Sequence, residues 1–426
     1  MPKISFPALL LLGLTVAGPC RADDLAPKGA LPTPDADNGG LTLPPGFHAV
    51  VVADKLKPLR AMTVAPNGDI YVKTRAAGIY GLRDADGDGR AEIVKEFGSG
   101  GGTGIVLRGE WLYHSTDNHV FRHWLTPGEL VPAGQPERIV RDLPNERQHA
   151  AKVIAFGADG RLYVEVGAPS NAYGKPDRAR GAVGQDPTVF LKTYGGFWRF
   201  DADKPDQTQA DGHHFSTGHR HATTLALNPF SGQLFTAIHG RDQLNTVAPQ
   251  FYTDDDNAEQ PAEVFHALTE GANYGWPFTY YDPIRKQRLL NPEYGGDGKK
   301  AAEPGQYPEP LIAFPAHWSP MQLAFYTGTQ FPAKYHRGAF LAFQGSWNRA
   351  PRPQAGYNVV FIPFNENNQP AGGYEIFADN FAGRAELASP KDAAHRPHGV
   401  AVGPDGSLYV SDSAHGRVWR IIYTGK

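Results

Sequence analysis

The sequence predicts an all-β fold, a six-bladed β-propeller. The main evidence is a motif that occurs six times: a short apolar run, a turn that contains glycine, and then an aromatic or branched strand. The copies span residues 62–72, 104–113, 153–164, 225–235, 323–342 and 400–410. Asn-Gly and Asp-Gly pairs accept positive φ at the central turn residues, so each copy predicts two adjacent antiparallel strands. The 49 glycines and 37 prolines suit many short strands joined by tight turns.

The spacing of the copies indicates one ring with insertions. The first three copies are separated by roughly the 40 to 50 residues of a propeller blade, and the later ones lie further apart. Residues 169–219 and 241–316 interrupt the rhythm, so we expect insertions there that line one face around the central channel. Residues 48–53 are expected to pair with residues 418–423 and to close the ring, which removes the exposed sheet edges.

The N-terminal residues 1–22 have the three parts of a secretory signal peptide: Lys3, an apolar stretch over residues 8–16, and small residues before an expected cleavage after Ala22. Cleavage would remove Cys20, the single cysteine, so disulfides and cysteine-ligated metals are not expected. The apolar stretch is too short to span a bilayer, which predicts no stable membrane insertion. The signal peptide predicts a periplasmic or secreted location.

The rest of the chain is interpreted as a flexible leader over residues 23–43, rich in proline, glycine and aspartate, and one propeller domain over residues 44–426. The formal net charge is −3 and there is no basic stripe, which argues against binding of nucleic acid.

Arginine and histidine residues precede the first strand of four of the six copies. An imidazole at such a position can take a proton from an alcohol, although an exposed loop histidine is the simpler alternative. A guanidinium there offers a fork of donors to carboxylates or carbonyl oxygens, and a structural loop arginine is its alternative. Because these residue types are rarely buried without partners, their recurrence predicts a cationic channel mouth for a polyanionic small molecule. The residues are Arg60, His149, Arg220, His221, Arg396 and His398.

Two segments are candidates for calcium. Asp84, Asp86 and Asp88 alternate with small residues in a pattern that suits a hard cation, or that forms a plain acidic turn. The segment is not an EF-hand, because Lys95 stands where a bidentate glutamate is needed.

In the second long insertion, residues 273–278 (NYGWPF) either stack a flat ligand or pack a corner. Asp242 and Glu263 precede this segment, and with nearby backbone carbonyls they are candidates for a second calcium site.

Taken in order, these motifs resemble the soluble sugar dehydrogenases that depend on pyrroloquinoline quinone (PQQ), a family with glucose, L-sorbosone and aldose dehydrogenases. The resemblance covers residues 44–423. It rests on His149 with the following VIAFGADG segment, on Gly218-His-Arg220, and on the ranges 192–199, 273–277, 345–349 and 396–406. The family usually has asparagine after the Gly-x-Arg element, where this chain has His221.

The resemblance implies oxidation of an aldose or related sugar aldehyde, with hydride transfer to PQQ and with Ca²⁺ as a second cofactor. It implies that His149, as the general base, and Arg220 are catalytic. Without a haem-attachment motif, an external electron acceptor is expected. The implied cofactor-binding residues are Arg220, His221, Trp347, Arg349, Arg396 and His398, and the implied calcium ligands are Gly240, Arg241, Asp242, Glu263 and Tyr274.

Two other functions are compatible with the sequence. One is a non-enzymatic binding propeller, suggested by His221 and by two cofactor contacts of the glucose dehydrogenases that have no clear counterpart here. The other is a calcium-dependent hydrolase of the lactonase type, in which channel carboxylates hold the metal ion.

Overall fold

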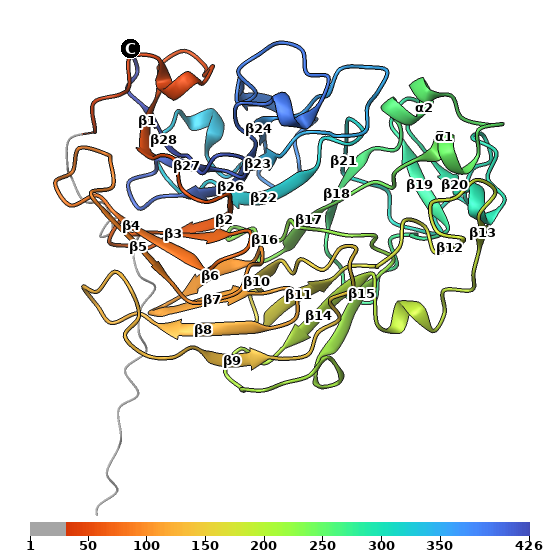
Figure 1. The fold of residues 1–426 in the computed structure, drawn as a ribbon, viewed down its shortest axis with the longest axis horizontal. Coiled ribbons are helices and arrows are strands. Elements are labelled where there is room, and N and C mark those ends of the chain that lie inside the picture. Colours follow the sequence, from red (N-terminus) through yellow and green to blue (C-terminus); the bar gives the residue numbers. More distant parts are fainter. Residues whose placement is uncertain (1–30) are drawn as a thin grey trace, which may run out of the picture.

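Six four-stranded antiparallel sheets form a ring in the computed structural model, which describes residues 31–426 (Figure 1). Each sheet is one blade, and the first strands of neighbouring blades contact one another around the channel axis. The predicted six-bladed β-propeller is confirmed. The predicted signal peptide lies outside the described residues.

In the first five blades the four strands are arranged in the order of the chain. The sixth blade consists of the last three strands and β1, the first strand of the chain. The first three blades are β2 (Leu59–Val64), β3 (Ile70–Thr74), β4 (Ile79–Arg83) and β5 (Ile93–Phe97); β6 (Ile105–Arg108), β7 (Trp111–Ser115), β8 (Val120–Trp124) and β9 (Glu137–Val140); and β10 (Ile154–Phe156), β11 (Leu162–Val166), β14 (Gly196–Phe200) and β15 (His213–Thr217). The others are β16 (Ala226–Leu227), β17 (Leu234–Ile238), β18 (Glu263–Ala267) and β21 (Ile312–Phe314); β22 (Pro320–Phe325), β23 (Ala339–Phe343), β24 (Asn358–Ile362) and β25 (Glu375–Ala378); and β26 (Pro397–Val402), β27 (Leu408–Asp412), β28 (Val418–Tyr423) and β1 (Phe47–Ala53).

The six predicted hairpins are the two innermost strands of the six blades. In the first blade Met62 pairs with Val72, and in the sixth Val400 pairs with Val410. The turns need glycine, because Gly68 and Gly406 adopt φ of 92° and 85°. The inner strands line a mostly apolar channel of about 380 Å³.

The ring is closed by β1, which pairs with β28 from Phe47 opposite Tyr423 to Ala53 opposite Val418. This confirms the predicted pairing of the two segments. The Phe47 ring meets three rings of the fifth blade edge-on, with centroids 4.8 to 5.3 Å away, namely Phe331, Phe377 and Tyr335. Gln322 of β22 adds a polar link, because its side-chain amide bonds to the backbone of Met62 in the first blade and Val400 in the sixth.

Part of the segment predicted as a flexible leader packs on the sixth blade. Leu41 is buried in the core between the fifth and sixth blades, and the carbonyl oxygen of Gly39 accepts a hydrogen bond from the indole of Trp419. Thr42 forms a bridge with Asp379. The short helix η2 (Asn38–Gly40) belongs to this segment.

The two long stretches predicted as insertions also contain the outer strands of the third and fourth blades. The excursions themselves lie to one side of the ring (Figure 1). They carry β12 (Gly174–Lys175), β13 (Val183–Gly184), α1 (Leu244–Val247), α2 (Asp254–Glu259), β19 (Thr279–Asp282), β20 (Gln287–Leu290), η3 (Phe190–Lys192) and η5 (Pro292–Tyr294). The remaining short helices are η4 (Gln209–Asp211), η6 (Ala333–Tyr335) and η7 (Pro390–Asp392). Over residues 31–426, none of the helices has the length and apolar character needed to cross a bilayer.

We expect Phe47→Ala to lower the free energy of unfolding by about 3 to 5 kcal/mol, because it leaves a cavity among aromatic rings at the closing strand. Urea unfolding measures the change. Ile376→Ala, at a side chain that is 49% exposed on the neighbouring β25, is the control and should change stability by less than about 0.5 kcal/mol. Equal effects of the two substitutions would contradict this role of Phe47.

Candidate functional site

Polar side chains gather at one end of the channel, where each inner strand begins and each second strand ends. Antiparallel pairing brings these two positions together in every blade. In the second blade Ile105 pairs with His114, and in the sixth Pro397 pairs with Asp412. Residues far apart in the sequence therefore meet at this end of the ring.

A cavity of about 130 Å³ lies at this end. It brings His149 and Arg220 together with other residues predicted from the sequence. The predicted residues that line it are His149, Arg220, His221, Gly240, Asp242, Glu263 and Trp347, and they are joined by His239, His317, Ser319 and Asn348.

His149 is held in one orientation by its backbone and its ring. Its φ of 58° lies in the left-handed region, which costs a non-glycine residue about 1 to 2 kcal/mol. Its Nδ1 is hydrogen-bonded to the carbonyl oxygen of Ala168, which can only accept, so Nδ1 carries the proton and Nε2 keeps its lone pair. Burial, with the neighbouring Arg220 and His221, lowers the pKa of His149 well below its ordinary value. The imidazole is therefore neutral and offers an acceptor nitrogen at neutral pH.

Arg220 and Asp242 form the central ion pair of the cavity. Nη2 of Arg220 lies 2.6 Å from Oδ2 of Asp242, while its Nη1 donates to the carbonyl oxygen of Gly240 at 2.8 Å. Arg178 donates to the same Oδ2 and Asn348 donates to Oδ1. Burial alone would raise the pKa of Asp242, but Arg220, His317 and Arg178 lower it to about 2. Within the described residues, the buried Nε of Arg220 has no hydrogen-bond partner.

His221 connects His149 to a buried carboxyl group. The two imidazole rings stack with centroids 4.8 Å apart, and Nδ1 of His221 lies 3.2 Å from Oε1 of Glu165 on β11. Gly167 permits this arrangement, because a Cβ there would lie 2.6 Å from the carbonyl oxygen of His149 and 2.8 Å from Nδ1 of His221. Even a methyl group at residue 167 would displace the stacked rings.

Two buried lysines near the channel were missed by the sequence analysis. Lys73 lies on β3 and Lys152 lies just before β10, and each side chain is at most 1% exposed. They donate to the carbonyl oxygens of Gly100 and Ala150, and neither forms a salt bridge within residues 31–426. Burial lowers the pKa of each to about 8. Their sequence signal is weak: a lysine at the end or start of an apolar strand.

The other cations of this end come from the first and sixth blades. Nη1 of Arg60 lies 3.1 Å from Nε2 of the fully buried His398. Arg396 donates to the carbonyl oxygens of Gln344 and Gly345. In the described part of the chain neither guanidinium forms a salt bridge, so this side of the channel mouth carries positive charge without a bound carboxylate.

Five predicted site residues do not line the cavity. Two of them, Arg396 and His398, have the contacts given above. The other three also have partners elsewhere: Arg349 pairs with Glu259, the buried Arg241 side chain pairs with Glu293, and the carbonyl oxygen of Tyr274 accepts a hydrogen bond from Arg288.

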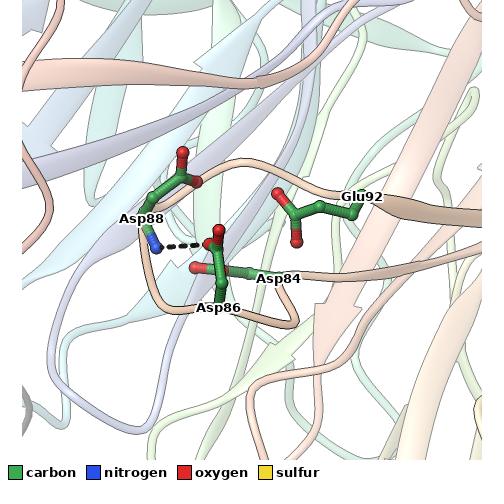
Figure 2. A group of neighbouring side chains, drawn as sticks. All are labelled: Asp84, Asp86, Asp88 and Glu92. Carbon is green, nitrogen blue, oxygen red and sulfur yellow. Dashed lines mark hydrogen bonds between the residues drawn. The ribbon is translucent and has the colours of Figure 1, made fainter.

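The predicted calcium loop is a compact acidic turn between β4 and β5 (Figure 2). One oxygen from each carboxylate lies within 4.8 Å of the others, and no comparable group of metal ligands occurs elsewhere in residues 31–426. Asp84 accepts the backbone N–H groups of Gly87 and Gly89, so its oxygens already stabilise the turn. The four residues are Asp84, Asp86, Asp88 and Glu92.

Residues 41–424 match the sequence profile of the TrAA12-like family, which is nearly the whole propeller. The chain belongs to this family. The residues that match the family model therefore form the six blades, and the first and last strands of the matched range pair in the sixth blade. A protein of Borreliella burgdorferi, described as uncharacterized, is 25% identical over 207 residues; the match spans 48% of this chain and 48% of that protein.

Several solved structures share the fold. A Trichoderma reesei carbohydrate-active enzyme of family AA12 superposes with a TM-score of 0.71, at 17% identity, over 90% of this chain and 97% of that one. The PQQ domain of pyranose dehydrogenase from Coprinopsis cinerea gives 0.71, at 18% identity, over 93% and 99%. The PQQ-bound aldose sugar dehydrogenase of Streptomyces coelicolor gives 0.56, at 19% identity, over 89% and 99%. The resemblance to PQQ-dependent sugar dehydrogenases is therefore confirmed at the level of the fold.

We expect Lys73→Met to stabilise the ligand-free protein by up to about 3 kcal/mol at pH 7, since the pKa falls from 10.5 to about 8 on folding. Below pH 8 both states are protonated and the folded state carries the full cost. Between pH 8 and 10.5 the unfolded state binds more protons, so the stability of the unsubstituted protein rises and the advantage of the variant shrinks.

Urea unfolding of both proteins from pH 6 to 10 measures this difference. Lys299→Met, at an exposed lysine, is the control and should show little change at any pH. An advantage of Lys73→Met that grows with pH would contradict the burial of an unpaired ammonium group.

Proposed function

We propose that this protein is a PQQ-dependent dehydrogenase that oxidises an aldose or a related sugar aldehyde, with His149 as the general base. One observation carries the proposal: cations from several blades without carboxylate partners meet a neutral imidazole at one end of the channel. The pyranose and aldose sugar dehydrogenases that share the fold support the same chemistry.

The residues at this end of the channel suit PQQ by their charge and by one exposed aromatic face. PQQ is a planar orthoquinone with carboxylates on its rim, and a site for it needs unpaired cations and a flat wall. Trp347 lines the cavity and is 54% exposed, which leaves the face of its indole available for stacking. The buried Nε of Arg220 also lacks a partner within the described residues. The side chains that would hold the carboxylates are those of Arg60, Lys73, Lys152, Arg220 and Arg396.

The chemistry divides between the cofactor and the protein. Bound PQQ supplies an acceptor for hydride. His149 takes the proton of the hydroxyl group that is oxidised, at Nε2, because Nδ1 is committed to Ala168. The pKa of His149 lies well below its ordinary value, so the basic form is present throughout the neutral range. Burial, together with the positive charge of Arg220, keeps the imidazole in this form.

Two finer features belong to the same proposal. The sugar is an aldose or an L-sorbosone-like aldehyde, and electrons leave through an external acceptor. The expected signal peptide supports export to the periplasm or secretion.

Calcium is proposed as the second cofactor, held by oxygen atoms of Asp242, Glu263 and Gly240. These three line the cavity beside His149 and Arg220, and they offer the hard ligands that Ca²⁺ prefers. Asp242 is ionised but engaged by Arg220, Arg178 and Asn348, so the ion must compete with these donors. Arg241 and Tyr274 are left out of this set because they do not line the cavity.

The function is tested by adding PQQ and Ca²⁺ to the purified protein and measuring dye reduction with a panel of sugars. We expect His149→Ala to bind PQQ, seen by its visible absorbance, and to lower kcat by about 10²- to 10⁴-fold through loss of the base. His213→Ala, at an exposed histidine on β15, is the control. Failure to take up PQQ would refute the proposal, and uptake without turnover would favour a binding propeller. Metal-dependent lactone hydrolysis without quinone absorbance would favour the hydrolase.

The place of calcium is tested by comparing PQQ affinity in Ca²⁺ and in EGTA. We expect tighter binding with Ca²⁺, an effect that is lost in Asp242→Asn and kept in Asp86→Asn, which alters the exposed loop. The reverse pattern would assign the calcium effect to the acidic turn between β4 and β5.

A further inference from the structure

Within the described residues, a buried carboxyl group that no lysine or arginine contacts lies behind the stacked imidazoles of the cavity. Glu165 is fully buried, and its Oε1 accepts the backbone N–H of Ala222 at 3.0 Å. Its Oε2 is buried and has no hydrogen-bond partner within residues 31–426. The ionisable side chain in contact with it is His221, and the buried Lys152 donates to Ala150 instead.

These contacts favour the neutral form of Glu165. An ionised carboxylate that is removed from water requires a cation or several donors, and an oxygen left unpaired makes it costly. Burial raises the pKa of Glu165 well above its ordinary value, although Lys152 and the backbone N–H groups of Ala222 and Gly167 act against the shift. The group is therefore a carboxylic acid at neutral pH, with one O–H to donate.

The acceptor for this O–H is Nδ1 of His221, 3.2 Å from Oε1. Burial, with Arg220, Lys152 and Arg60 nearby, lowers the pKa of His221 to about 3, so the ring is neutral. A neutral imidazole that accepts at Nδ1 carries its proton on Nε2.

We propose that Glu165 is a positioning residue that, as a neutral acid, fixes His221 with its proton on Nε2. The stacked rings then present opposite hydrogen-bonding groups to a ligand: an acceptor from His149, whose proton lies on Nδ1, and a donor from His221. Gly167, directly after β11, permits this spacing, because a Cβ there would lie 2.8 Å from Nδ1 of His221.

The chemical use of the pair rests on the proposed function. When a hydroxyl group is oxidised, its proton leaves oxygen, a hydride leaves the adjacent carbon, and negative charge grows on the group that would accept the hydride. His149 accepts the proton, and the Nε2–H of His221 stabilises the growing charge beside it. Such a donor acts on kcat more than on KM, because the charge is greatest in the transition state.

The protonation states are tested on the ligand-free full chain labelled with ¹⁵N-histidine. We expect the His221 signals, assigned by their absence in His221→Asn, to show a proton on Nε2, and those of His149 to show a proton on Nδ1. Infrared difference spectra between the unsubstituted protein and Glu165→Gln at pH 7 should contain the C=O band of a carboxylic acid. A proton on Nδ1 of His221, or a carboxylate band in place of the acid band, would overturn the inference.

Two substitutions separate positioning from packing. The amide of Glu165→Gln can still donate to Nδ1 of His221, so this variant should keep the tautomer and a kcat within about threefold of the original. Glu165→Leu has no donor and should lower kcat about tenfold or more with little change in KM. Equal losses in the two variants would contradict the positioning role. Because the spectra need no cofactor or turnover, they decide the inference even if Glu165→Leu does not fold or if the proposed dehydrogenase activity is absent.

Discussion

The pairing of β1 with β28 is the interaction on which the geometry of the channel mouth depends. No single blade contains the site: Arg60 comes from the first, Glu165 from the third, Asp242 from the fourth and His398 from the sixth. Neighbouring blades touch through side chains and through single backbone hydrogen bonds, such as that from the N–H of Gly104 to the carbonyl oxygen of Lys152, whereas the closure of the ring uses a full strand ladder. The hydrogen bonds that complete the sixth sheet therefore also fix distances between groups on other sheets.

The unpaired cations at this end of the channel favour the binding of an anion and lower the stability of the ligand-free protein. Lys73 and Lys152 are buried and Arg60 is partly buried, and within the described residues no carboxylate contacts any of the three. Buried ions without partners are costly, and proteins keep them where a ligand supplies the missing charge. An anionic guest that enters the mouth relieves this cost, so folding and binding are coupled through the same side chains.

The sequence was sufficient for the fold and for about half of the site, for identifiable reasons. Glycine turns and aromatic strands are local signals, so all six inner hairpins and the closing pair were predicted. His149, Arg220 and Asp242 precede or follow inner strands, and the ring brings those positions together. The failures arise where partners are remote in sequence. Arg349 pairs with Glu259 and Arg241 pairs with Glu293, and neither arginine lines the cavity. The sequence around each arginine gives no sign of its distant partner. Lys73 was missed because a lysine in an apolar strand resembles an exposed edge residue until its burial is known.

Gln322 lies on β22 of the fifth blade, and its side-chain amide forms hydrogen bonds to Met62 of the first blade and Val400 of the sixth. It therefore links three blades at the place where the ring closes. For the sixth blade to move outward, these partly buried amide hydrogen bonds would have to break together with the β1–β28 ladder. Opening the ring here therefore costs more than the β1–β28 ladder alone, so we expect a ligand to enter the mouth through movement of its loops while the blades keep their places.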